Sequence, residues 1–155
     1  MLKKRIIPCL DIQGNNTVKG VNFLELRNCG NPDELAKKYV KEGADELVFL
    51  DIAATINDKK ILTNLVENIS YEINIPFTVG GGIKTLSDVH NVISAGADKI
   101  CINSSAFYNP LLINNISKQY GNQCVVVAID GKLENNEWMV YVNAGSTPTR
   151  IKVID

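Results

Sequence analysis

Two aspartates stand at the ends of apolar runs, where they could exchange protons with a substrate. Asp11 closes the first such run and Asp130 the last. Because side chains alternate between the faces of a strand, each aspartate is expected to share a face with the residue two positions before it. That residue is Cys9 for Asp11 and Ala128 for Asp130. Burial and repulsion can separate the pKa values of two facing carboxylates into an acid and a base, so Asp11 and Asp130 are the predicted catalytic pair. Asp51 ends another run with the opposite parity and is expected to point toward the helices. A cap or loop anchor is the alternative role for each aspartate.

Groups that could bind a phosphate follow two neighbouring apolar runs. Gly81 and Gly82 lie between a run and a helix start, where glycine lets backbone N–H groups approach an anion and the helix N-terminus favours negative charge. Asn103 and Ser104 end the next run and add amide and hydroxyl donors. The pattern predicts a phosphate site, and a purely structural glycine turn is the alternative.

Four charged residues occupy places where charge calls for an explanation. Lys19 lies among Asn and Gly in the segment 13–30, which is long for a connection and is interpreted as a mobile loop that brings a cation to the substrate. Arg5, Glu46 and Lys99 stand at the amino ends of strands with inward parity, as a charged ring beneath an apolar interior. A solvated lysine and a solvated salt-bridge cluster are the respective alternatives.

The elements that must position these residues alternate between strands and helices. Apolar runs flanked by Gly, Asn or Pro predict strands buried on both faces, and segments of period 3.6 predict helices. The predicted strands are residues 5–12, 46–52, 76–79, 99–103 and 124–130. The predicted helices start after Asn31, near Ile61, at Thr85 and at Asn109. Pro32 at the first helical position and a capping box of Thr85 with Asp88 mark two of these starts.

This order predicts a parallel sheet of about five strands with four right-handed crossover helices. Gly43-Ala44-Asp45 recurs as Gly96-Ala97-Asp98, as expected of repeated βα units. A (β/α)8 TIM barrel needs about 250 residues, so residues 1–155 are predicted to be the amino-terminal part of one barrel whose remainder is absent after residue 155. An open five-stranded sheet is the alternative. Residues 137–143 are expected to add a strand in a hairpin, and residues 149–155 to begin a new segment.

The composition excludes several classes of function. Lysine and arginine total 16 against 17 acidic residues, with a net charge of −1, which argues against binding to nucleic acid or anionic membranes. No apolar stretch reaches the roughly 20 residues of a membrane span. Cys9, Cys29, Cys101 and Cys124 have no C-x-x-C spacing, and three of them lie in apolar runs and are expected to be buried thiols. Disulfides and a zinc site are therefore not expected, and the expected location is a reducing cytoplasm.

Six segments resemble the cyclase subunit of imidazole glycerol phosphate synthase. They are residues 4–11 (KRIIPCLD), 18–23 (VKGVNF), 45–52 (DELVFLDI), 76–83 (PFTVGGGI), 96–99 (GADK) and 125–130 (VVVAID). The resemblance runs through the whole chain in order, and it covers about three-fifths of a barrel of about 250 residues.

The resemblance implies a TIM-barrel lyase of histidine biosynthesis. Such a cyclase uses ammonia to convert a phosphoribulosyl-formimino aminoimidazole carboxamide ribotide, which has a phosphate at each end, into imidazole glycerol phosphate and aminoimidazole carboxamide ribotide. The ammonia comes from a glutaminase subunit docked on the amino-terminal face of the barrel and passes through an ammonia channel. No cofactor is implied.

The resemblance also implies roles for individual residues. Asp11 and Asp130 match the two acid–base carboxylates of the family, and Lys19 matches the lysine of its mobile loop. The family's phosphate site is matched by Gly82, Asn103 and Ser104, where the family usually has Thr in place of Ser104. The family's ammonia gate is matched by Arg5, Glu46 and Lys99. The fourth gate residue and the second phosphate site would lie after residue 155.

Three other functions remain open. One is the isomerase of the same pathway, against which the segment 18–23 and the charged ring argue. Another is a cyclase-like paralogue that acts on a sugar in surface polysaccharide synthesis, against which the presence of both aspartates argues. The third is a non-catalytic half-barrel or interaction module. For this last case a homo-oligomer is expected, because the sheet edges and inward faces would be uncovered.

Overall fold

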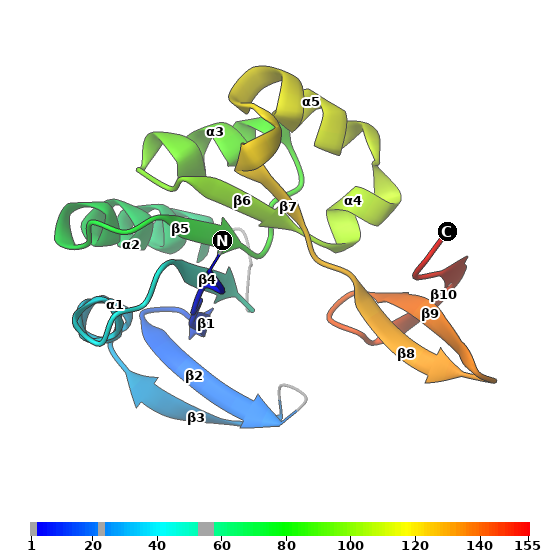
Figure 1. Cartoon of the computed structure of the whole chain (residues 1–155), viewed down its shortest axis with the longest axis horizontal. Coiled ribbons are helices and arrows are strands. Elements are labelled where there is room, and N and C mark those ends of the chain that lie inside the picture. The colour runs from blue at the N-terminus through cyan, green and yellow to red at the C-terminus, as the bar shows by residue number, and fades with distance from the viewer. Residues whose placement is uncertain (1–2, 22–23, 53–57) are drawn as a thin grey trace. The chain divides into compact units, whose positions relative to one another are not determined.

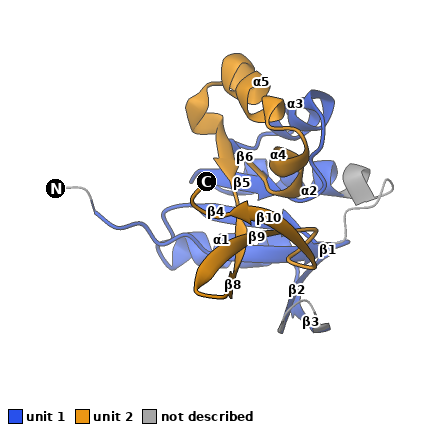
Figure 2. Cartoon of the chain, turned by 90° about the vertical axis from the view of Figure 1, so that its right-hand side faces the viewer, with its two compact units in different colours: residues 1–100 blue, residues 101–155 orange. Residues whose placement is uncertain are grey.

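The computed structural model describes residues 3–21, 24–52 and 58–155. Its internal contacts divide the chain into two units, residues 1–100 and residues 101–155, which have different colours in Figure 2. The boundary falls within one strand, β6 (Lys99–Ile102). Each predicted site residue therefore belongs to a defined unit.

The first unit is built on a mixed sheet in the order β3-β2-β1-β4-β5-β6 (Figure 1). Its other strands are β1 (Cys9–Gln13), β2 (Asn16–Val21), β3 (Leu24–Gly30), β4 (Leu47–Asp51) and β5 (Phe77–Gly80). β4 pairs in parallel with both β1 and β5, whereas β2 pairs antiparallel with β1 and β3. The predicted parallel sheet is thus confirmed.

Three helices of the first unit alternate with these strands: α1 (Pro32–Lys41), α2 (Asp58–Glu72) and α3 (Leu86–Ser94). The side chain of Asn31 accepts hydrogen bonds from the N–H groups of Asp33 and Glu34, the second and third residues of α1. Thr85 and Asp88 form the predicted capping box at the start of α3. Both helix starts lie where the sequence predicted them, because a cap satisfies backbone donors within a few residues of itself.

One face of the parallel sheet is buried and the other is partly open. Leu47 and Phe49 of β4 are fully buried, whereas Val48 and Leu50 between them are partly exposed. β1 has the same alternation, with Leu10 buried beside an exposed Cys9. The prediction of burial on both faces is therefore correct for β5 and wrong for β1 and β4, and the expected burial of the Cys9 thiol is wrong for the same reason.

The segment 13–30 was expected to be a loop, and in this respect the prediction is wrong. It contains the antiparallel pair β2 and β3, which extends the sheet beyond β1. Gly14, with φ of 60°, lies in the turn that reverses the chain into β2. The buried Thr17 and Val18 are β-branched residues that favour a strand, and Lys19 follows them on β2 with its side chain exposed. Residues 22–23, between the two strands, lie outside the described residues.

The second unit begins with two helices, α4 (Ser104–Tyr108) and α5 (Leu111–Tyr120), followed by the 3₁₀ turn η1 (Asn122–Cys124) and β7 (Val125–Val127). β7 lies beside the end of β6, where the Ala128 N–H donates to the Ile102 carbonyl. β8 (Asp130–Glu134), β9 (Glu137–Val142) and β10 (Thr147–Lys152) form an antiparallel sheet in the order β10-β9-β8.

One prediction for the second unit needs correction, and two are confirmed. The expected hairpin exists as β8 and β9. However, the strand predicted over residues 124–130 ends at Val127, so Asp130 opens β8 instead of closing a parallel strand. The helix predicted to start at Asn109 is α5, and residues 104–108 form a further short helix before it, which Asn109 and Pro110 separate from α5.

Candidate active site

Asp11 lies on the partly open face of the first unit's sheet and is itself partly exposed. Its backbone is held from both sides, in register with Val18 of β2 and Leu50 of β4. Within the described residues its carboxylate has no ion-pair partner. Asp51, in contrast, is 7% exposed and shares the buried parity of Leu47. Asp11 is therefore the aspartate whose carboxylate can reach a ligand on the open face.

The loop after β5 is shaped by glycine at positions where a side chain is excluded. Gly81 and Gly82 have φ of 97° and 64°, and a Cβ built on Gly81 would overlap the carbonyl oxygen of Asp51 and lie 2.8 Å from its nitrogen. The N–H groups of Lys84 and Thr85 both donate to the capping-box carboxylate at 3.0 Å. The N–H groups of Lys84 and Thr85 are therefore already used by a side chain of α3 and are not available to an anion.

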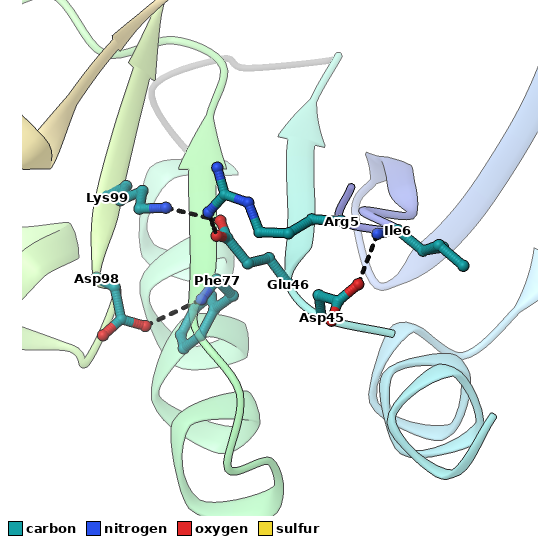
Figure 3. A network of polar contacts seen from close by, with 7 residues as sticks. All are labelled: Arg5, Ile6, Asp45, Glu46, Phe77, Asp98 and Lys99. Atoms are coloured by element: carbon teal, nitrogen blue, oxygen red, sulfur yellow. Dashed lines mark hydrogen bonds and ion pairs between the residues drawn. The ribbon is translucent and has the colours of Figure 1, made fainter. Parts of the chain in front are cut away.

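A buried carboxylate lies between two cations at the amino ends of the strands (Figure 3). Glu46 is 6% exposed, and its two oxygens bond separately to the Arg5 guanidinium and to Lys99 Nζ, the latter at 2.6 Å. A buried ionised carboxylate is costly unless it is paired and hydrogen-bonded, and the two cations provide that pairing. The structure thus brings together the three residues of the predicted charged ring.

The repeated Gly-Ala-Asp segments anchor the strands beside this cluster, a role that sequence analysis missed. The carboxylate of Asp45 accepts the Ile6 N–H at 2.7 Å, and that of Asp98 accepts the Phe77 N–H at 2.9 Å (Figure 3). Each aspartate also donates its own N–H to the carbonyl of the same partner. The recurrence of the segment could have revealed this role, because identical motifs before two strands are expected to make the same local hydrogen bonds.

In the second unit, two residues predicted for different roles are hydrogen-bonded to each other. Asn103, expected to bind phosphate, donates from Nδ2 to Oδ2 of Asp130 at 3.1 Å. Ser104 accepts the Asn143 N–H at 2.8 Å through Oγ.

Burial raises the pKa of the Cys101 thiol, which keeps it protonated at neutral pH and makes it a poor nucleophile.

No three His, Cys, Asp or Glu side chains among the described residues are grouped so that they could hold a metal ion. No helix in the described part of the chain is long and apolar enough to cross a membrane.

Comparison with known proteins gives the class of this fold and site. Residues 5–155 match the family model described as "Histidine biosynthesis protein", whose members are TIM barrels. The order of parallel strands and helices described above is that of part of such a barrel. The chain belongs to this histidine biosynthesis protein family.

Similar curated proteins are named "Imidazole glycerol phosphate synthase subunit HisF". The protein from Flavobacterium johnsoniae is 56% identical over 155 residues, which is 100% of this chain and 62% of the relative. That from Parabacteroides distasonis is 55% identical over 149 residues, 96% of this chain and 59% of the relative. That from Dehalococcoides mccartyi strain CBDB1 is 48% identical, covering 100% and 61%. The chain thus spans about three-fifths of the length of these relatives.

Proposed function

We propose that this chain forms part of a cytoplasmic cyclase subunit of imidazole glycerol phosphate synthase. In this proposal it uses ammonia from a glutaminase subunit to convert the phosphoribulosyl-formimino ribotide into imidazole glycerol phosphate and aminoimidazole carboxamide ribotide. The observation that carries the proposal is the identity of 48–56% to the HisF proteins over the whole chain.

The proposed chemistry assigns proton transfer to the two aspartates. Ammonia must lose protons as its nitrogen forms new bonds in the imidazole ring, and the departing aminoimidazole nitrogen must gain one. Asp11 and Asp130 are carboxylates suited to these steps. Gly81 and Gly82 would offer backbone N–H groups, and Ser104 a hydroxyl, to one phosphate of the substrate. Lys19, exposed on β2, would approach the substrate as a cation.

The direct test uses residues 1–155 joined to the remaining part of the Flavobacterium johnsoniae relative, here called the completed chain. With ammonium salt and the ribotide, it should form both products without any glutaminase. Residues 1–155 alone should give little or no turnover, because further substrate contacts are expected beyond them. A completed chain that is folded and inactive would overturn the proposed function.

We propose that the Arg5, Glu46 and Lys99 cluster gates ammonia instead of taking part in the chemistry. Leu50 is in register with Asp11, and Glu46 lies four residues before it, about 13 Å along the strand. A side chain at that distance cannot exchange protons with a substrate held at Asp11. The cluster lies at the opposite ends of the strands, where the glutaminase subunit is proposed to dock.

Replacing Lys99 by methionine in the completed chain should lower glutamine-dependent turnover, measured with the glutaminase subunit, more than turnover with free ammonium. The substitution removes one of the two cations paired with Glu46. Lys37→Met, which breaks an exposed ion pair with Glu72 of 2.8 Å, is the matched control and should change neither rate. An equal loss in both assays would contradict the gate.

Residues 1–155 by themselves are expected to self-associate through the open face of the parallel sheet. Ile7 is 39% exposed there, beside an exposed Cys9 and a partly exposed Val48, and burying such apolar surface is favourable. Sedimentation at micromolar concentration should show dimers or larger species, and Ile7→Asp should shift them toward monomer. Tyr71→Asp, on an exposed position of α2, is the control. A stable monomer would contradict the prediction.

A further inference from the structure

We propose that Asn103 is a positioning residue that orients the Asp130 carboxylate, and not a ligand of the substrate phosphate. The inference rests on the proposed function, in which Asp130 transfers protons. It concerns residues of the second unit alone, and it assigns Asn103 a different task from the one expected from sequence.

The first observation is that Asn103 does not use its side chain for the local purpose that asparagine usually has at this position. Asn103 is the N-cap of α4, and asparagine is among the preferred N-cap residues because its side chain accepts a backbone N–H. Here the side chain makes no capping bond, although the backbone carbonyl accepts the Ala106 N–H at 2.9 Å. The side-chain amide is instead directed to Asp130, 27 residues away, at 3.1 Å.

The second observation is that Asp130 has little else to hold its carboxylate. It is the first residue of β8, in register with Tyr141 of β9, and the two residues before it belong to no strand. Lys132, two residues further on, donates to the Gly145 carbonyl at 2.9 Å and lies over the Tyr141 ring. Within the second unit the Asn103 amide is the hydrogen-bond donor to this carboxylate, and Oδ1 remains for a substrate.

The third observation concerns charge. A phosphate bound to the same amide nitrogen would lie next to the Asp130 carboxylate, and two anions at that separation repel each other. Ser104 has no such conflict: its Oγ accepts the Asn143 N–H, which leaves the hydroxyl proton to be donated. The two adjacent residues therefore divide the work, with Ser104 suited to the phosphate and Asn103 to the carboxylate.

The kinetic test compares Asn103→Ala and Ser104→Ala in the completed chain. Loss of an orienting group should lower kcat by roughly 10- to 100-fold with little change in KM. Loss of a phosphate contact should mainly raise KM, as expected for Ser104→Ala. Asn103→Ala that raises KM and leaves kcat unchanged would overturn the proposal.

A double-mutant cycle distinguishes positioning from an independent contribution. If Asn103 acts through Asp130, Asn103→Ala with Asp130→Asn should be no slower than Asp130→Asn alone. Losses that multiply would overturn the proposal while leaving the cyclase assignment intact. A completed chain without turnover would instead overturn the proposed function, and the Asn103–Asp130 pair would then be judged by spectroscopy.

That second measurement is made on residues 1–155 without turnover. The Asn103 side-chain NH₂ resonances, assigned by their loss in Asn103→Ala, should move in Asp130→Asn because the charged acceptor is lost. The side-chain resonances of Asn143, whose Nδ2 donates to Tyr108 and Thr147, are the internal control and should stay in place. Asn103 resonances that ignore Asp130→Asn, or that move when inorganic phosphate is added, would contradict the pairing.

Discussion

Asp11→Asn in the completed chain should lower ammonia-dependent turnover by about 10²–10⁴-fold, the usual contribution of general acid–base catalysis. Asparagine has nearly the same shape as aspartate but cannot take up or release the proton. The backbone of Asp11 is held by β2 and β4 through main-chain pairing, so the fold and the affinity for the ribotide should change little.

The measurement is the steady-state rate at saturating ammonium, together with circular dichroism to confirm the fold. Glu67→Gln, the same carboxylate-to-amide change at an exposed position of α2, is the matched control and should retain the full rate. A near-normal rate for Asp11→Asn would show that this carboxylate is not the proton-transfer group. Asp130→Asn, measured alongside, would show which of the two carboxylates is more critical.

The helix starts could be predicted because their signals are local. Asn31 is followed by Pro32, and Thr85 is followed three residues later by Asp88, so each pattern satisfies helix N–H groups within one turn. The strand β9 was also predictable, since an apolar run follows the short Asn135-Asn136 turn, where both residues have positive φ. These features depend on neighbours in sequence and need no knowledge of the tertiary fold.

The errors concern a segment of strands that resembles a loop, a strand that ends earlier than predicted, and the exposure of a strand face. The segment 13–30 contains Gly and Asn and resembles a loop, but β2 finds a partner in the edge of β1. Alternation alone assigned Cys9 and Asp11 to one face of the sheet correctly. It could not show that this face stays partly open, because burial depends on what lies opposite.

The sequence predicted which residue types of the candidate site stand at strand ends. It did not predict which of these residues contact each other. The charges of Arg5, Glu46 and Lys99 indicated a cluster, and their parity placed them on one face. The bond between Asn103 and Asp130 was not foreseen, because Asp130 was predicted to end the fifth parallel strand rather than to begin β8. An asparagine that leaves its own helix uncapped becomes visible only when the side-chain direction is known.

Gly81→Ala should be the most destabilising of the conservative substitutions in the loop that follows β5. The new methyl group would overlap the Asp51 carbonyl oxygen, and the neighbouring atom is backbone, which cannot rotate away. Overpacking costs about 1–3 kcal/mol, and a strained backbone conformation such as φ of 97° costs about 1–3 kcal/mol more. The free energy of unfolding should therefore fall by about 2–6 kcal/mol, measured by urea denaturation at fixed protein concentration.

Gly43→Ala separates the two causes, because Gly43 has φ of 91° and no atom within 4 Å of a built Cβ. This variant has the backbone strain without the clash and should lose only about 1–3 kcal/mol. If both variants lose the same amount, the loop at Gly81 can move away from Asp51 at no cost, and the close approach is not what requires glycine there. If Gly81→Ala fails to fold while Gly43→Ala folds, the clash with Asp51 costs more than the whole stability of the fold. The excluded side chain would then explain why the proposed phosphate loop presents bare backbone N–H groups: the contact with Asp51 that fixes the loop leaves room for nothing larger than glycine.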